Sequence, residues 1–226
     1  MARGPGVDQP GPIRLLIVDD HDLFRTGLSS LLADGLGIEI VAQASGGRMG
    51  VRLARELKPD VVLMDLRMPD LDGIDAIRLI VEEDPTARVI ALTVASSEHD
   101  VAAAVLAGAC GYLVKDSPVD EIVVAVRAAA RGEAWLSPRA ATALVDRVRS
   151  SNVEPPAEEL TVIAELSARE LEVLRLVARG LENSEIAYEL GISPRTAKNH
   201  LSSILAKLGV TNRIQAAIYA VRSGLA

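Results

Sequence analysis

The sequence predicts an α/β domain with a doubly wound, five-stranded parallel sheet, followed by a small all-α domain of four helices. Between residues 13 and 134, short apolar runs that end in turn residues alternate five times with stretches at helical spacing. This alternation is typical of successive βα units. From residue 167 onward the spacing is helical throughout. Polar residues also follow the apolar runs directly, as expected at the carboxyl ends of buried parallel strands.

The expected strands of the first domain are apolar runs at residues 13–18, 38–42, 61–64, 89–92 and 111–114. Apolar residues at three- and four-residue spacing predict helices between and after them, at residues 23–32, 49–57, 74–81, 98–107 and 119–131. Pro59 ends the second helix and Pro118 opens the last one. The third run is apolar at every position before Asp65, so we expect a central strand that is buried on both faces.

Five polar residues stand at or just after the ends of these strands: Asp19, Asp20, Asp65, Thr93 and Lys115. Crossover helices place the carboxyl ends of parallel strands on one edge of a sheet, and open α/β sheets bind their ligands at that edge. We therefore expect the five residues to converge, although up to 96 positions separate them in the sequence. Taken singly, each has an ordinary explanation as a helix cap or a solvated side chain.

The chemistry of this set favours a phosphoacceptor site. Three carboxylates at one edge repel each other unless a cation binds them, and Mg²⁺ takes oxygen ligands in an open site. A carboxylate such as Asp65 beside that cation attacks phosphorus and forms an acyl phosphate. Lys115 would neutralise the transferred group as a point charge, and the Thr93 hydroxyl would donate a hydrogen bond to it.

The second domain is expected to contain helices at residues 168–179, 185–190, 194–208 and 212–222. Each follows a capping residue: Ser167, Asn183 or Ser184, Ser193, and Thr211 or Asn212. The first cap forms a capping box with Glu170. A glycine turn at Gly191 separates the short second helix from the longer third one, and this order is typical of a helix-turn-helix.

The helix at 194–208 has an apolar side and a polar side. Its polar side carries Arg195, Lys198, Asn199 and Ser202, at spacings of three and four residues. These residue types recognise DNA, because Lys and Arg bind phosphate or guanine, Asn binds adenine and Ser binds either purine. Backbone amides at the helix start, beside Ser193 and Thr196, would bind a phosphate. The alternative is an ordinary solvated face on a small helical domain.

Composition narrows the class of protein. The chain has 226 residues, of which 49% are hydrophobic, and no apolar run is long enough to cross a bilayer. Residues 1–12 lack the apolar core of a signal peptide, and we expect them to form a flexible tail. The single cysteine, Cys110, can form no intrachain disulfide, which favours a cytoplasmic location.

The distribution of charge changes at the same boundaries as the pattern of expected strands and helices. Residues 1–134 carry −8, residues 135–163 carry −1 and residues 164–226 carry +2, within a net charge of −7. An acidic first domain and a mildly basic second domain indicate different partners. The segment 135–163 is expected to be a partly helical linker, in which Ser137 and Pro138 open a helix through about Arg149.

The first domain resembles the receiver domain of two-component response regulators, which has a flavodoxin-like fold. The resemblance covers residues 13–134 and rests on the strand-end residues with 64–69, Gly73 and 111–115. It implies that Asp65 takes a phosphoryl group from a sensor histidine kinase. It implies Mg²⁺ ligands at Asp19, Asp20, Asp65 and the main-chain carbonyl of Arg67. It also implies a switch in which Thr93 moves toward the phosphoryl group and Tyr112 turns inward. The side chain at position 67 influences how long the phosphate lasts.

The second domain is similar to the LuxR-type helix-turn-helix at 166–170, 185–187, Ser193, Thr196, 198–200, 204–208 and Arg213. With the receiver, this identifies the NarL/FixJ subfamily. The resemblance implies that the unphosphorylated receiver packs on the helix-turn-helix and masks 194–208. Phosphorylation then releases it, and a homodimer reads an inverted repeat in promoter DNA. The last helix has a core stripe at Ile214, Ala217, Ile218 and Val221, with the small residues Ala216 and Ala220 beside it, and the resemblance makes this helix a candidate dimer surface. Ala197 and Ser202 depart from the usual residues, so a base preference does not carry over.

Two rival functions belong to other classes. A phosphatase with an aspartyl nucleophile would have a second acid at position 67, where this chain has Arg; we therefore expect no enzyme. An orphan regulator would use an unphosphorylated receiver as an interaction module. The complete set of strand-end residues argues against that second alternative.

Overall fold

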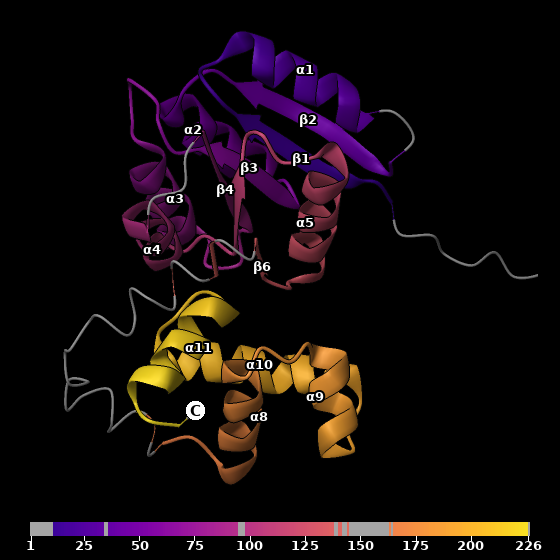
Figure 1. The fold of residues 1–226 in the computed structure, drawn as a ribbon, viewed down its shortest axis with the longest axis vertical. Coiled ribbons are helices and arrows are strands. Elements are labelled where there is room, and N and C mark those ends of the chain that lie inside the picture. Colours follow the sequence, from indigo (N-terminus) through magenta and orange to yellow (C-terminus); the bar gives the residue numbers. More distant parts are fainter. Residues whose placement is uncertain are drawn as a thin grey trace, which may run out of the picture.

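The structure is a computed structural model that describes residues 11–33, 36–94, 98–137, 140–141, 144, 163 and 165–225. Its first domain is a parallel sheet with the strand order β2-β1-β3-β4-β5-β6 (Figure 1). The strands are β1 (Ile13–Val18), β2 (Ile38–Ala44), β3 (Val61–Asp65), β4 (Val89–Thr93), β5 (Gly111–Val114) and β6 (Trp135–Leu136). From β1 the chain runs to the edge strand β2, returns past β1 to β3 and then continues in order to β6 at the other edge, and this reversal confirms the doubly wound fold.

Helices cover both faces of this sheet (Figure 1). They are α1 (Asp22–Ala33), α2 (Gly47–Leu57), α3 (Gly73–Glu83), α4 (Glu98–Ala107) and α5 (Val119–Arg131). One buried apolar cluster joins the sheet to α1 and α5, and a second joins it to α2, α3 and α4. The residues of β3 and β4 are all buried, as the continuous apolar runs predicted.

The expectation of five strands is wrong by one. Trp135 and Leu136 form β6, which pairs in parallel with Gly111 and Tyr112 of β5. A strand of two residues shows no alternation that a sequence pattern can reveal. The expected linker therefore begins inside the sheet. Ser137 then accepts a hydrogen bond from Ala140 N–H at 3.2 Å, as its predicted capping role requires; most of the helix expected through Arg149, and residues 1–10 of the tail, lie outside the described residues.

The second domain contains α8 (Ala168–Ala178), α9 (Asn183–Leu190), α10 (Pro194–Leu208) and α11 (Arg213–Arg222). Three expected caps are confirmed, at Ser167 with its capping box, at Ser193 and at Asn212. The expected cap of α9 is wrong, because Asn183 and Ser184 both lie inside the helix. Glu182 is the capping residue, and its N–H donates to the Glu185 carboxylate at 2.7 Å.

The helix-turn-helix domain lies against the amino-terminal edge of the sheet, opposite the edge that carries Asp65 (Figure 1). A groove between the domains is lined on the receiver side by residues that precede β4, β5 and β6: residues 85–88, Cys110 and residues 132–134. Its other wall comes from α10 and the start of α11. Helix α11 contacts α4 directly, and Ile214 belongs to the same buried apolar cluster as α4.

Candidate functional site

The ends of β1, β3 and β5 bring three charged side chains into contact. Asp19 and Asp65 are buried, with 0% and 1% of their surface exposed. The Lys115 ammonium lies 2.7 Å from Asp19 Oδ2 and 2.8 Å from Asp65 Oδ2. The convergence predicted from the strand ends is therefore present between residues that stand 96 positions apart.

The loop after Asp65 is fixed at both of its ends. At Gly73 a Cβ atom would lie 2.0 Å from the Asp65 carbonyl oxygen, so only glycine fits there. The Asp70 carboxylate accepts hydrogen bonds from Gly47 N–H at 2.9 Å and Arg48 N–H at 3.1 Å. The start of α2 thus holds this loop in place, and the loop in turn sets the position of the acceptor carboxylate.

The electrostatics of the site favour a bound cation. Ligand atoms of Asp19, Asp20, His21 and Asp65 all lie within 4.8 Å of one another. Lys115 supplies a single ammonium for three carboxylates. Burial raises the pKa of Asp65, and the negative charge of Asp19 raises it further, against a lowering by Lys115. The three carboxylates of this cluster, with their surplus negative charge, fit a hard divalent ion such as Mg²⁺.

His21 is a member of this cluster that sequence reasoning missed. Its Nδ1 lies 3.0 Å from Asp20 Oδ1, and its own N–H donates to Asp19 Oδ1 at 2.8 Å. The side chain is largely exposed. The one sequence signal for its place in the cluster was its position directly after Asp19 and Asp20. This signal is weak, because an exposed histidine beside carboxylates is common.

The remaining predicted residues surround the acceptor. Thr93 ends β4 and is buried, and β4 pairs with β3 so that Leu92 lies opposite Asp65. Arg67 N–H donates to Asp65 Oδ1 at 3.3 Å. Tyr112 is fully buried, and its hydroxyl has no hydrogen-bond partner among the described residues. The side chain is therefore enclosed in this structure, and the switch of Tyr112 stays a prediction. Burial, and then the negative charge of Asp100, raise the pKa of Tyr112 to about 12.

The predicted DNA-binding residues lie on the outer side of α10. Arg195, Lys198, Asn199 and Ser202 are exposed; we call these four residues the reading face. The inward positions Ala197, Leu201, Ile204 and Leu208 are buried. At the start of the helix, Ser193 accepts from Thr196 N–H at 3.0 Å. The expected masking of 194–208 is present in part: Lys198 and Ser202 line the groove that faces the receiver, yet their side chains remain exposed.

Glu170 fixes the orientation of α10 and was predicted only as a capping residue. Its carboxylate accepts from Ser203 Oγ at 2.7 Å and from Lys207 Nζ at 2.8 Å, both on α10. It also accepts from Ser167 N–H at 2.8 Å. The hydrogen bonds from Lys207 and Ser203 lower the pKa of this buried carboxyl to about 2. One side chain therefore joins α8 to the helix that carries the reading face.

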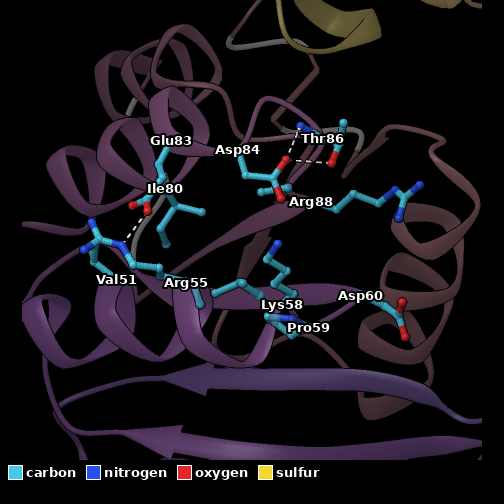
Figure 2. A pocket seen from close by; sticks show the side chains of 13 residues that line it. Val51, Arg55, Lys58, Pro59, Asp60, Ile80, Glu83, Asp84, Thr86 and Arg88 are labelled. Carbon is cyan, nitrogen blue, oxygen red and sulfur yellow. Dashed lines mark hydrogen bonds and ion pairs between the residues drawn. The ribbon is translucent and has the colours of Figure 1, made fainter.

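A separate cleft lies at the amino-terminal edge of the sheet, between α2 and α3 (Figure 2). Arg55 and Glu83 form an ion pair across it at 2.5 Å. Asp84 accepts from Thr86 N–H at 2.9 Å and from Thr86 Oγ1 at 2.6 Å. The cleft contains none of the predicted site residues, so we assign no part of the phosphoacceptor chemistry to it.

Comparison with known proteins agrees with this geometry. Residues 15–127 match the family model of the response regulator receiver domain, and residues 164–220 match that of bacterial regulatory proteins of the luxR family. The chain is 44% identical to the transcriptional regulatory protein LiaR of Bacillus subtilis, over 94% of this chain and 99% of LiaR.

Two solved structures cover nearly the whole chain. The response regulator ChrA of a heme-sensing two-component system is 39% identical, with a TM-score of 0.52, over 96% of this chain and 100% of ChrA. A complex of the response regulator RcsB with DNA is 25% identical, with a TM-score of 0.54, over 94% of this chain and 99% of RcsB. Among the described residues, none of the helices has the length and apolar character needed to span a membrane.

Proposed function

This chain belongs to the response regulators that join a receiver domain to a LuxR-type helix-turn-helix, a family of phosphorylation-controlled, DNA-binding transcription regulators, and we propose that Asp65 is its phosphoacceptor. A sensor histidine kinase is the proposed donor. One Oδ of Asp65 attacks the phosphorus of a phosphohistidine, the P–N bond breaks as the new P–O bond forms, and the imidazole leaves with the electron pair and takes up a proton.

The residues around Asp65 support each part of this reaction. Asp19, Asp20, Asp65 and the carbonyl of Arg67 would hold Mg²⁺, which when bound neutralises charge that develops on the phosphoryl oxygens. The Lys115 ammonium donates to the Asp65 carboxylate in this structure, and after the transfer it would bind an oxygen of the phosphoryl group on Asp65. Thr93 stands on the adjacent strand and would donate its hydroxyl to a phosphoryl oxygen. No further residue is needed for the transfer, since the donor brings an activated phosphorus.

The contact of Lys115 with both Asp19 and Asp65 is the observation that carries this proposal. Intact mass after treatment with acetyl phosphate tests it, with and without Mg²⁺, on wild type, Asp65→Asn and the control Asp60→Asn. Asp60 is an exposed carboxylate at the opposite edge of the sheet. One phosphoryl group is expected on wild type and on Asp60→Asn, and none on Asp65→Asn or without Mg²⁺. An adduct on Asp65→Asn would show that another residue accepts the phosphoryl group, and none on wild type after rapid quenching would assign the receiver to protein interaction alone.

The reading face would enter the major groove of promoter DNA. Arg195 and Lys198 would bind phosphate or guanine, Asn199 adenine, and Ser193 and Thr196 a phosphate at the helix start. Because Lys198 and Ser202 line a groove whose other wall is the receiver, a duplex reaches them only after the domains separate. Phosphorylation would shift an existing equilibrium toward that open form, which dimerises on an inverted repeat.

A further inference from the structure

We propose that the side-chain amides of Asn212 and Gln215 hold the two domains together, Gln215 by binding carbonyls in the last turn of α4 and Asn212 by binding the carbonyl of Ala109, just after that helix. This inference rests on the proposed function and adds the contact that phosphorylation must break. The helix-turn-helix domain touches the edge of the sheet opposite Asp65, so a signal from the acceptor needs an element that spans the receiver. The ten residues of α4 span about 15 Å.

The contacts at the carboxyl end of α4 are hydrogen bonds between the two domains. Gln215 Nε2 donates to Val105 O at 2.9 Å and to Leu106 O at 3.2 Å. Asn212 Nδ2 donates to Ala109 O at 3.1 Å and is buried. The last carbonyls of a helix have no partner within the helix and carry partial negative charge. Val105 O also accepts from Gly108 N–H at 3.0 Å within the receiver, so the Gln215 amide adds a second donor to this carbonyl.

The oxygen of each amide is bound within its own domain. Asn212 Oδ1 accepts from Ile214 N–H and Gln215 N–H, both at 3.0 Å, and so caps α11. Gln215 Oε1 accepts from Thr211 N–H at 2.8 Å and from Thr211 Oγ1 at 3.1 Å. These partners fix the orientation of both amides, because a flip would set N–H groups against donors. Each side chain thus links the start of α11 to the receiver with no freedom to rotate.

The same contact covers the candidate dimer surface. Ile214 is buried in the apolar cluster that contains Val101 and Val105 of α4, and Ile218 packs against that cluster. The sequence pattern assigns both residues to the core stripe of the last helix, and the resemblance makes that helix a candidate dimer surface. The receiver therefore covers part of this helix, and the amide contacts would restrain dimerisation by holding it in place.

The other end of α4 is tied to the acceptor loop. The Arg67 guanidinium lies 2.7 Å from Asp100 Oδ1, in the first turn of α4, and Asp100 is only 7% exposed. The N–H of the same arginine donates to Asp65. A phosphoryl group at Asp65 brings roughly two negative charges and is a strong bidentate partner for a guanidinium. Arg67 would move from Asp100 to that group, and α4 would lose one of the contacts that hold it, and with it the carbonyls bound by Asn212 and Gln215, in place.

The single native cysteine reports on this contact. Cys110 is half-buried and lines the groove between the domains together with Asn212. Burial raises the pKa of its thiol to about 12, so the closed form reacts slowly with N-ethylmaleimide. Intact mass then gives the labelling rate of the unphosphorylated full-length chain, with no ambiguity about which residue has reacted.

Gln215→Glu is the decisive variant, because it keeps the oxygen that accepts from Thr211 and replaces the donor with a carboxylate that repels the α4 carbonyls. An acidic residue in the first turn of α11 also suits the helix dipole. We expect Cys110 to be labelled about tenfold faster, within the usual range of coupling between two sites. Gln43→Glu is the matched control, since it makes the same change at an exposed glutamine of β2, outside the groove, and should label at the wild-type rate. Acetyl phosphate should bring wild type to the rate of Gln215→Glu.

Asp100→Asn tests the other end of α4. It should speed labelling on its own and add nothing in the Gln215→Glu background, because both changes open one contact. The inference is overturned if Gln215→Glu labels at the wild-type rate, if Gln43→Glu labels as fast as Gln215→Glu, or if the effects of Gln215→Glu and Asp100→Asn are additive. If Gln215→Glu labels fast but Asp65 gains no phosphoryl group, the proposed amide contact stands and the proposed phosphoacceptor role of Asp65 fails. If Asp65 gains a phosphoryl group but Gln215→Glu labels at the wild-type rate, the phosphoacceptor role stands and the amide contact fails.

Discussion

The proposed phosphoacceptor edge and the proposed reading face of α10 are both polar sites, but they are built in opposite ways. At the acceptor edge, Asp19 and Asp65 are buried around one ammonium group. On the reading face, Arg195 and Lys198 are exposed, and no carboxylate among the described residues forms an ion pair with them. A charge removed from the acceptor edge should therefore change folding as well as function. A charge removed from the reading face should change binding alone.

Lys115→Met should give the largest effect, because it leaves two buried carboxylates without their shared counter-charge. We expect the receiver to lose about 3 kcal/mol of unfolding free energy. Mg²⁺ should restore part of this loss, since a cation among the carboxylates replaces the missing charge. Urea unfolding followed by the fluorescence of Trp135, the one tryptophan, reports on the receiver. Equal stability of Lys115→Met and wild type without Mg²⁺ would show that the buried charges are not coupled.

Glu170→Gln should cost the helix-turn-helix domain about 2 kcal/mol, because a buried hydrogen-bonded charge is lost. The pKa of Glu170 is lowered to about 2 from an ordinary value of 4.5. Its contribution to stability is therefore present above pH 4.5 and disappears as the pH falls toward about 2. Circular dichroism during acid titration should show this loss in wild type but not in Glu170→Gln. Glu172→Gln, on the exposed side of α8, should behave as wild type.

Lys198→Ala should leave stability unchanged and weaken DNA binding by about one phosphate contact. The dissociation constant should rise several-fold, and the slope of log K against log salt should fall by about 1. Arg175→Ala removes the same charge from an exposed position on α8 and should have little effect. Fluorescence anisotropy at several salt concentrations separates the two variants. If the slope of log K against log salt is unchanged in Lys198→Ala, Lys198 makes no phosphate contact and does not belong to the DNA-binding surface.

The difference between the two sites also explains what the sequence could predict. The five strand-end residues could be placed because parallel strands share one carboxyl edge, whatever the distance in sequence. The reading face could be placed because residues three and four positions apart share one side of a helix. In both cases the repeating geometry of a single element or sheet is sufficient.

Contacts that depend on the packing of separate elements could not be predicted. Arg67 and Asp100 pair across a loop and a helix, and nothing in their spacing relates one to the other. Asn212 was predicted as a cap, but its second hydrogen bond goes to Ala109 of the other domain. The short β6 strand was missed because two residues carry no pattern. Predicting any of these three features requires knowing how one element is placed relative to another, and the local periodicity of the sequence does not give that placement.

The most direct test of the account is the affinity of the full-length protein for DNA before and after phosphorylation of Asp65. The duplex would be selected from a random-sequence pool with the phosphorylated protein, and intact mass would confirm the phosphoryl group in each titrated sample. We expect binding to become tighter by about tenfold or more in wild type, and to stay unchanged in Asp65→Asn. Wild type that carries the phosphoryl group but binds the duplex no more tightly than before would contradict the account.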